Sequence, residues 1–161
     1  MESAVVLAPG TERNALAARF ADVIRKNVQA SSGKREAFED LQGSVFVVVN
    51  DPPSPPDLPR ASVAPGWGGA LTLRFDFGQL TIHDGLVGVP VVTLRGAPQV
   101  IEGLPDLQPR LSGRTVRGAL ATLAALRWIR RQEEDALKVY GLSRHPQLTV
   151  GVLRVLSRHR W

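Results

Sequence analysis

Apolar and polar residues alternate through the middle of the chain. A two-residue period is typical of strands that bury one face. It predicts a β-hairpin over residues 71–83, with a turn at 76–78, followed after a second turn at 84–85 by a third strand over 91–94. The core-forming sheet is therefore expected to centre on an antiparallel meander. The apolar positions of the hairpin are Leu71, Leu73, Phe75, Leu80 and Ile82.

An unbroken run of β-branched and aromatic residues, Val45 to Val49, precedes this region. Such a run is typical of a central strand that is buried on both faces. Four prolines follow within residues 52–56, and proline has no backbone N–H to donate to a sheet. We therefore predict that residues 50–68 form an extended, exposed, proline-rich loop.

Apolar residues with helical spacing flank the strands. Leu16, Phe20, Ile24 and Val28 lie on one stripe of a helix that Thr11 can cap. Residues 115–131 are apolar on nearly all sides, which is typical of a helix that is buried or covers an apolar surface. The other predicted elements are short helices over 34–41 and 97–104, a strand over 137–140, and a last helix from Pro146 with Leu148, Val152, Val155 and Leu156 on one face.

These elements predict an α+β fold. It has one antiparallel or mixed sheet of about five strands, with helices packed on one face. The 161 residues are expected to form a single domain, large enough to bury about 70% of the surface of its unfolded chain. Residues 1–10 are predicted to be a loose N-terminal lead-in, and residues 157–161 a basic tail that frays.

Composition narrows the classes of function. The formal net charge is +5, a modest excess that allows weak attraction to an anionic membrane surface and is also usual for a solvated protein surface. The chain has no cysteine, which excludes disulfides, thiolate metal sites and thiol catalysis. It has no apolar run long enough to span a membrane and no basic, apolar start typical of a secretory signal. The predicted location is the cytoplasm.

Candidate catalytic residues are few. His83 precedes Asp84 at a predicted strand end, which allows a histidine–carboxylate pair, but no third partner can be placed. A histidine with local hydrogen bonds is the simpler interpretation. No nucleophile elbow, phosphate loop or metal-ligand motif is present, and the strands lack the aromatic pattern of RNA-binding sheets. We therefore predict no catalysis, no cofactor, no metal and no nucleic-acid partner.

The order of elements resembles the sterol carrier protein type 2 fold in its compact bacterial form, over roughly residues 16–156. The hairpin at 71–85 is similar to the family's hairpin. The strand Val92–Gly96 with the helix to Leu104 is similar to its strand and short helix, and the strand Leu137–Tyr140 with Gly141 and the helix to Leu156 is similar to its closing pair. The proline-rich loop and the 115–131 helix are longer than the corresponding parts of the family.

The resemblance implies an apolar cavity between sheet and helices. Such a cavity would take a sterol, a fatty acyl chain or an isoprenoid lipid, because burying apolar surface contributes about 25 cal/mol per Å² without polar partners. The expected function is non-catalytic binding or transfer of this hydrophobic ligand. The expected lining residues are Phe75, Leu80, Ile82, Val100, Ile101, Leu104, Leu120, Leu123, Leu126, Val152 and Leu156.

A second hypothesis uses the same fold without a cavity. If the 115–131 helix fills the space, the chain is a non-catalytic adaptor that binds a protein partner through that helix or the proline-rich loop. All the expected lining residues would then be ordinary core. The presence or absence of an accessible apolar cavity of several hundred Å³ distinguishes the two hypotheses.

Overall fold

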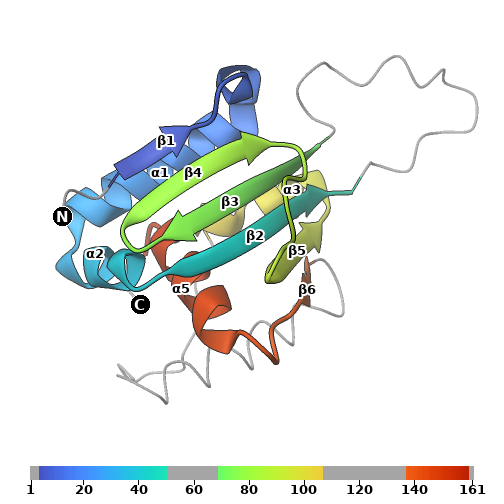
Figure 1. Ribbon diagram of the computed structural model, residues 1–161. Coiled ribbons are helices and arrows are strands. Elements are labelled where there is room, and N and C mark those ends of the chain that lie inside the picture. The colour runs from blue at the N-terminus through green and yellow to red at the C-terminus, as the bar shows by residue number, and fades with distance from the viewer. Residues whose placement is uncertain (1–3, 51–68, 107–136, 160–161) are drawn as a thin grey trace, which may run out of the picture.

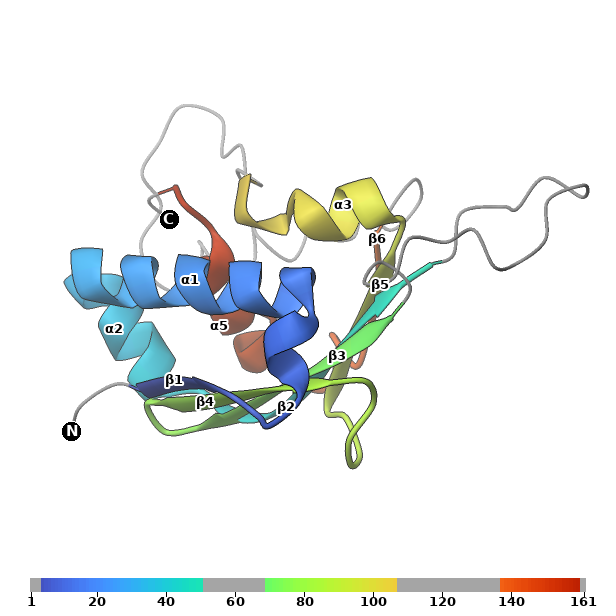
Figure 2. The ribbon, with the colours of Figure 1, turned by 90° about the horizontal axis from the view of Figure 1, so that it is seen from above.

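The computed structural model describes residues 4–50, 69–106 and 137–159. Within these ranges the strands form one six-stranded mixed sheet in the order β1-β4-β3-β2-β5-β6. The described helices pack on one face of this sheet, here called the helix face, and none of them lies on the opposite, outer face (Figures 1 and 2). The predicted α+β class and one-sided layering are confirmed, with six strands where about five were expected.

Strand β2 (Gln42–Val49) is central, as its apolar run predicted. It pairs antiparallel with β3 (Ala70–Asp76) and parallel with β5 (Val92–Gly96). Val45 and Val47 are fully buried on the helix face, and Phe46 is buried on the outer face. Hydrogen bonds on both edges and burial of the three residues 45–47 keep water from the middle of the strand, which agrees with its apolar sequence.

The predicted hairpin is also confirmed. Strand β3 pairs antiparallel with β4 (Gln79–Asp84). The two-residue turn has positive φ at Phe77 (39°) and at Gly78 (84°), the backbone twist that tight hairpins favour. The Phe77 N–H donates to the Leu41 carbonyl at 3.0 Å, which ties the turn to the start of β2.

The predicted three-strand meander is wrong at its third strand. Strand β5 does not pair with β4 but lies on the other side of β2 and runs parallel to it. Residues 85–91 therefore cross the outer face between the two strands. The hydrophobic pattern of β5 is the same for either neighbour, so the pattern cannot select its position.

The lead-in prediction is corrected by a sixth strand. Residues 4–7 form β1 (Ala4–Leu7), which pairs in parallel with β4. Without β1, the backbone groups along this edge of β4 would be unpaired, a state that proteins avoid. Val5 and Leu7 also pack against the core, so the short apolar run gains both hydrogen bonds and burial.

The predicted strand at 137–140 is confirmed as β6 (Leu137–Tyr140), antiparallel to β5. The described helices follow the predicted order: α1 (Ala15–Ala30), α2 (Ser32–Glu39), α3 (Pro98–Glu102) and α5 (Pro146–Leu156). Two short 3-10 turns, Thr11–Arg13 and Leu104–Asp106, precede α1 and follow α3. Residues 51–68 and 107–136, which contain most of the proline-rich loop and the predicted 115–131 helix, lie outside the described residues.

The helix cap and the tail differ from expectation. Asn14, not Thr11, caps α1, and Thr11 is buried with its hydroxyl accepting the Asp84 N–H at 3.0 Å. The tail at 157–159 is anchored rather than frayed. Ser157 is fully buried, the Arg158 N–H donates to the Pro105 carbonyl at 2.7 Å, and the Arg158 guanidinium pairs with Asp106 at 3.2 Å.

One continuous cluster of buried apolar side chains lies between the helix face and the helices. Phe20, Ile24 and Val28 of α1 are buried in it, and Phe38 of α2 meets Phe75 of β3 edge to face with ring centroids 6.2 Å apart. Helix α5 buries four apolar side chains within the five residues 152–156, where Arg154 is the exception. These four are Val152, Leu153, Val155 and Leu156.

Candidate functional site

The structure places the expected lining residues in or against the core. Seven of them are 2% exposed or less and belong to one buried cluster, Val100 is partly buried against it, and Leu120, Leu123 and Leu126 lie outside the described residues. Their burial suits both a cavity wall and a solid core, so a cavity among them remains a prediction. The seven are Phe75, Leu80, Ile82, Ile101, Leu104, Val152 and Leu156.

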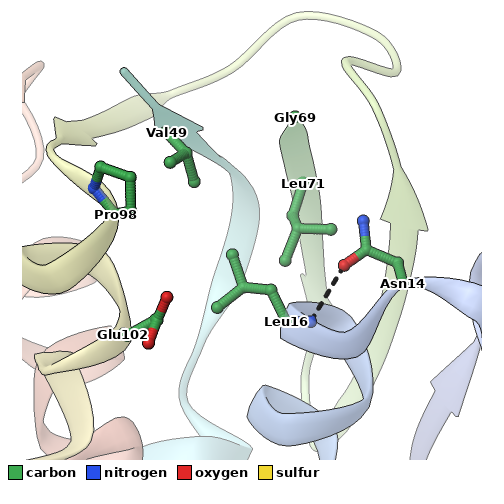
Figure 3. Close-up of a pocket in the computed structure, with 7 residues that line it drawn as sticks. All are labelled: Asn14, Leu16, Val49, Gly69, Leu71, Pro98 and Glu102. Carbon is green, nitrogen blue, oxygen red and sulfur yellow. Dashed lines mark hydrogen bonds between the residues drawn. The ribbon is translucent and has the colours of Figure 1, made fainter. Parts of the chain in front are cut away.

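A pocket lies nearby, where the start of α1, the end of β2, the start of β3, and α3 come together (Figure 3). Its apolar surface comes from Leu16, Val49, Leu71 and Pro98, and Gly69 leaves it open beside the sheet. Asn14 and Glu102 supply its polar side chains. Leu16, Val49 and Leu71 point toward one another in Figure 3, so the interior is apolar while polar groups lie to the side.

Asn14 holds one side of the pocket rigidly. Its Oδ1 accepts the N–H groups of Leu16 and Ala17, each at 3.1 Å, and so caps α1. Its Nδ2 donates to Asp84 Oδ1 at 2.8 Å and joins the helix start to the end of β4. One side chain thereby fixes the position of Leu16 relative to the sheet.

Helix α3 forms the opposite side. Pro98 occupies its first turn, where a missing N–H costs no hydrogen bond. Glu102 ends the helix and lies 3.9 Å from the guanidinium of Arg19 on α1, which is also 3.9 Å from Asp106. These pairs are long and partly exposed, so they hold α1 and α3 together only weakly.

The pocket is small. It encloses about 20 Å³, room for roughly one water molecule, whereas ligand sites usually measure about 300–1,000 Å³. A hydrophobic ligand could enter only if α1 and α3 moved apart. The weak pairs between these helices, and the short length of α3, are compatible with such a movement.

The sequence prediction did not include the seven residues of this pocket. The sequence predicts Leu16 and Leu71 as apolar positions of a helix and a strand, and Asn14 precedes a helical pattern, which is a usual cap signal. Nothing in the sequence indicates that α1 and α3 leave a space between them. That space depends on how two helices far apart in sequence sit over the same sheet.

The His83–Asp84 pair does not form a catalytic arrangement. The two residues are consecutive in β4, so their side chains leave opposite faces of the sheet. Asp84 accepts from Asn14 on the helix face, whereas His83 lies beside Thr72, whose side chain is on the outer face. Within the described residues, no group of three or more His, Asp or Glu side chains is arranged to hold a metal ion.

A second, wider hollow of about 680 Å³ lies between α2, the start of α5 and the β3–β4 turn. It is open to solvent and mixes apolar side chains, including Phe77 and Leu148, with the charged side chains of Asp40, Arg144 and Arg154. This mixed lining is more typical of a protein contact than of a lipid site. None of the helices in the described ranges is long and apolar enough to cross a bilayer.

The chain is similar to several proteins of known structure. No family model and no curated protein sequence matches the chain. A structure described as an SCP2 domain of the ubiquinone synthesis protein UbiJ is 17% identical, with a TM-score of 0.49 over 88% of this chain and 94% of the other. A structure of sterol carrier protein 2 is 14% identical, with a TM-score of 0.46 over 85% and 92%.

A Thermus thermophilus protein described as possibly a sterol carrier protein is 14% identical, with a TM-score of 0.44 over 85% of this chain and 83% of the other. The family named in these descriptions is the one that the sequence was expected to resemble. With identities below 20% and TM-scores below 0.5, the function of this chain has to be inferred from its own residues.

Proposed function

We propose that this chain binds a hydrophobic ligand without catalysis, between the sheet and the helices, and that the ligand enters at the pocket between α1 and α3. The observation that carries the proposal is the pocket's lining: an apolar interior of Leu16, Val49 and Leu71 with polar side chains beside it. An acyl, sterol or isoprenoid chain needs this arrangement, because its apolar length leaves water while its polar end stays at the surface.

The first test is native mass spectrometry of the purified chain, followed by organic extraction. A near-stoichiometric hydrophobic molecule would support the proposal and identify the ligand class. A mass without ligand, together with no uptake of a fluorescent fatty acid or sterol, would contradict it.

Gly69 offers a sharper test by mutation. Among the described residues, a Cβ at this position would meet no atom within 4 Å, so Gly69→Trp is expected to fold and to place an indole over the pocket. We expect this variant to take up at least tenfold less fluorescent ligand than the wild type. Gln79→Trp is the matched control, since it adds the same side chain at an exposed position at the other end of the hairpin. Equal uptake by both variants would rule out entry at this pocket.

The adaptor is the second candidate, and the small volume of the pocket favours it. In that case the buried residues expected to line a cavity form a filled core, and a protein partner binds at the surface. The wide hollow beside Phe77 and Arg144 is the described surface that suits such a contact. An unliganded mass would shift the assignment to this function.

A further inference from the structure

The outer face of the sheet carries an exposed aliphatic ridge, formed by Leu86, Val87 and Val89. These side chains are 57%, 48% and 85% exposed. They belong to the β4–β5 connection, which projects from the side of the sheet opposite the helices (Figure 2). Adjacent exposed aliphatic residues are costly to keep in water, which indicates that the ridge serves a contact.

Hydrogen bonds fix the ridge to the sheet. The Thr72 hydroxyl donates to the Gly85 carbonyl at 2.8 Å and accepts the Val87 N–H at 2.9 Å. At the far end, the Val91 N–H donates to the Ser44 carbonyl at 2.8 Å. Thr72 is 1% exposed although no described helix covers this face of its strand. The ridge is therefore held in place as part of the outer face.

Three cationic side chains, here called the outer cations, surround the ridge on the same face. They are Arg74 of β3, Arg95 of β5 and Lys138 of β6, all exposed. Their strand neighbours Phe75, Leu94 and Val139 are buried in the core, so alternation directs the cations outward. Arg95 is directly opposite Lys138, and Arg74 is opposite Ser44, where the ridge ends.

Arg95 and Lys138 also line an open hollow of about 450 Å³ with Asn50 and Tyr140. Arg95 Nε donates to Asn50 Oδ1 at 2.5 Å, which orients the guanidinium at the rim. Tyr140 is 53% exposed and adds a hydroxyl on an aromatic ring. Two cations and a phenol around one hollow suit a phosphate-containing head group.

In the part of the chain that the structure describes, no carboxylate forms an ion pair with the outer cations, although Asp76 lies on the same face. A partner for this face has to accept both the aliphatic ridge and the outer cations. A second copy of the chain would place like charges opposite one another. A nucleic acid would pair with the cations but would leave the aliphatic ridge in water. An anionic bilayer accepts both, since aliphatic side chains enter its interfacial region while lipid phosphates attract the cations.

We propose that the outer face docks on an anionic lipid bilayer, with the ridge inserted among the head groups and the outer cations on lipid phosphates. The described helices lie on the opposite face of the sheet (Figure 2). The pocket between α1 and α3 is lined by Leu16 and Leu71, which belong to that side. Docking therefore does not depend on whether the pocket holds a ligand.

Vesicle flotation tests the proposal. We expect the wild type to float with phosphatidylcholine vesicles that contain about one third phosphatidylserine, and to stay unbound with phosphatidylcholine alone. Arg95→Gln combined with Lys138→Gln should weaken binding at least about tenfold, since each cation near the surface contributes severalfold. Leu86→Ser combined with Val89→Ser should weaken it by a similar factor at unchanged net charge.

The matched control is Arg13→Gln combined with Lys26→Gln. It removes the same charge from exposed positions away from the outer face, and circular dichroism checks the fold of each variant. The control is expected to bind like the wild type. No binding by the wild type, or equal loss in the control, would overturn the proposal. Tighter binding to single-stranded RNA, with the ridge variant unaffected, would overturn it in favour of a nucleic acid.

A label reports insertion directly. The chain has no cysteine, so Val89→Cys accepts a polarity-sensitive fluorophore at the most exposed ridge position. Its emission should shift to the blue with anionic vesicles, while the same label at Gln29→Cys, an exposed position on α1, should not shift. A label at position 89 that stays in water while the protein floats would contradict insertion.

Discussion

At the residue scale, Asn14 connects local sequence to the candidate site. Its side chain caps α1 through two N–H groups and reaches Asp84 at the end of β4. The cap is a local signal that the sequence contains. The bond to Asp84 spans 70 residues and exists only in the folded chain.

Replacing Asn14 separates these two roles. Asn14→Ala removes both, and we expect it to lower the free energy of unfolding by about 1–2 kcal/mol, the usual cost of a lost cap. Asn14→Ser keeps an oxygen that can cap the helix but is too short to retain the bond to Asp84, so it should cost less. Urea denaturation of the three proteins measures both effects. Equal stability of Asn14→Ala and the wild type would show that the cap contributes nothing.

Lys34 illustrates a charge that the fold tolerates at a cost. Its side chain is buried and its ammonium donates to the Ser157 carbonyl beyond the end of α5. Burial, with the nearby positive charge of Arg154, lowers the pKa of Lys34 below its usual value of 10.5. The folded chain therefore releases this proton more readily than the unfolded chain.

The sign of the pH dependence follows. Between the lowered pKa of Lys34 in the folded chain and its pKa of 10.5 in the unfolded chain, the free energy of unfolding rises with pH. This stabilisation is complete above pH 10.5 and is lost as pH falls through the folded-state pKa. Relative to Lys34→Met, the wild type should therefore gain stability as pH rises toward 10.5. Denaturation of both proteins across this alkaline range is the measurement. Lys26→Met, at an exposed position of α1, controls for the loss of one positive charge. A constant difference between wild type and Lys34→Met would contradict the lowered pKa.

At the scale of elements, the connections between strands determine the strand order more than the strand sequences do. Strand β5 has an ordinary apolar pattern, yet it is placed beside β2 by a connection that crosses the outer face. The turn between β6 and α5 also packs against the start of β5. Gly141 lies in that turn with φ of 86°, and a Cβ there would collide with the backbone carbonyl oxygen of Val91.

Gly141→Ala should therefore destabilise the chain by about 3 kcal/mol or more, because it combines left-handed strain with a backbone clash. Gly10 provides the control. It has the same φ of 86°, but no atom of the described residues lies within 4 Å of the added Cβ, so Gly10→Ala should cost only about 1–2 kcal/mol. Thermal denaturation compares the two variants. Similar losses would show that the turn can move away from β5.

At the scale of the whole molecule, the two faces of the sheet are suited to different contacts. The helix face is covered by an apolar core with a small pocket at the meeting of α1 and α3. The outer face has no helix in the described ranges and carries the ridge and the outer cations. A one-sided α+β sheet makes this division possible because alternate residues of every strand serve different faces.

Ligand binding at the helix face should stabilise the entire fold. A fluorescent fatty acid or sterol that binds the folded chain but not the unfolded chain stabilises the fold. At a concentration a hundredfold above its Kd it should raise the free energy of unfolding by about 3 kcal/mol and Tm by roughly 5–10 °C. Differential scanning calorimetry measures the shift, and Gly69→Trp should show none. A shift of equal size in that variant would place the ligand elsewhere on the molecule.

Local patterns in the sequence predict the class of fold and most of its elements. Two-residue alternation defined β3 and β4, an unbroken apolar run defined the central β2, and helical spacing located α1 and α5. These patterns are local, because each element must bury one side wherever it lies. They also identified the residues that became the core, including Phe75, Ile101 and Val152.

Which elements become neighbours follows from the packing of the whole chain. The pairing of β1 with β4, the place of β5 beyond β2, and the anchored residues 157–159 all depend on partners distant in sequence. The α1–α3 pocket and the aliphatic ridge arise in the same way, from a gap between two helices and from a connection laid across a sheet. The spacing of hydrophobic residues predicts whether a side chain is buried or exposed. Which residues surround that side chain follows from how the whole chain packs.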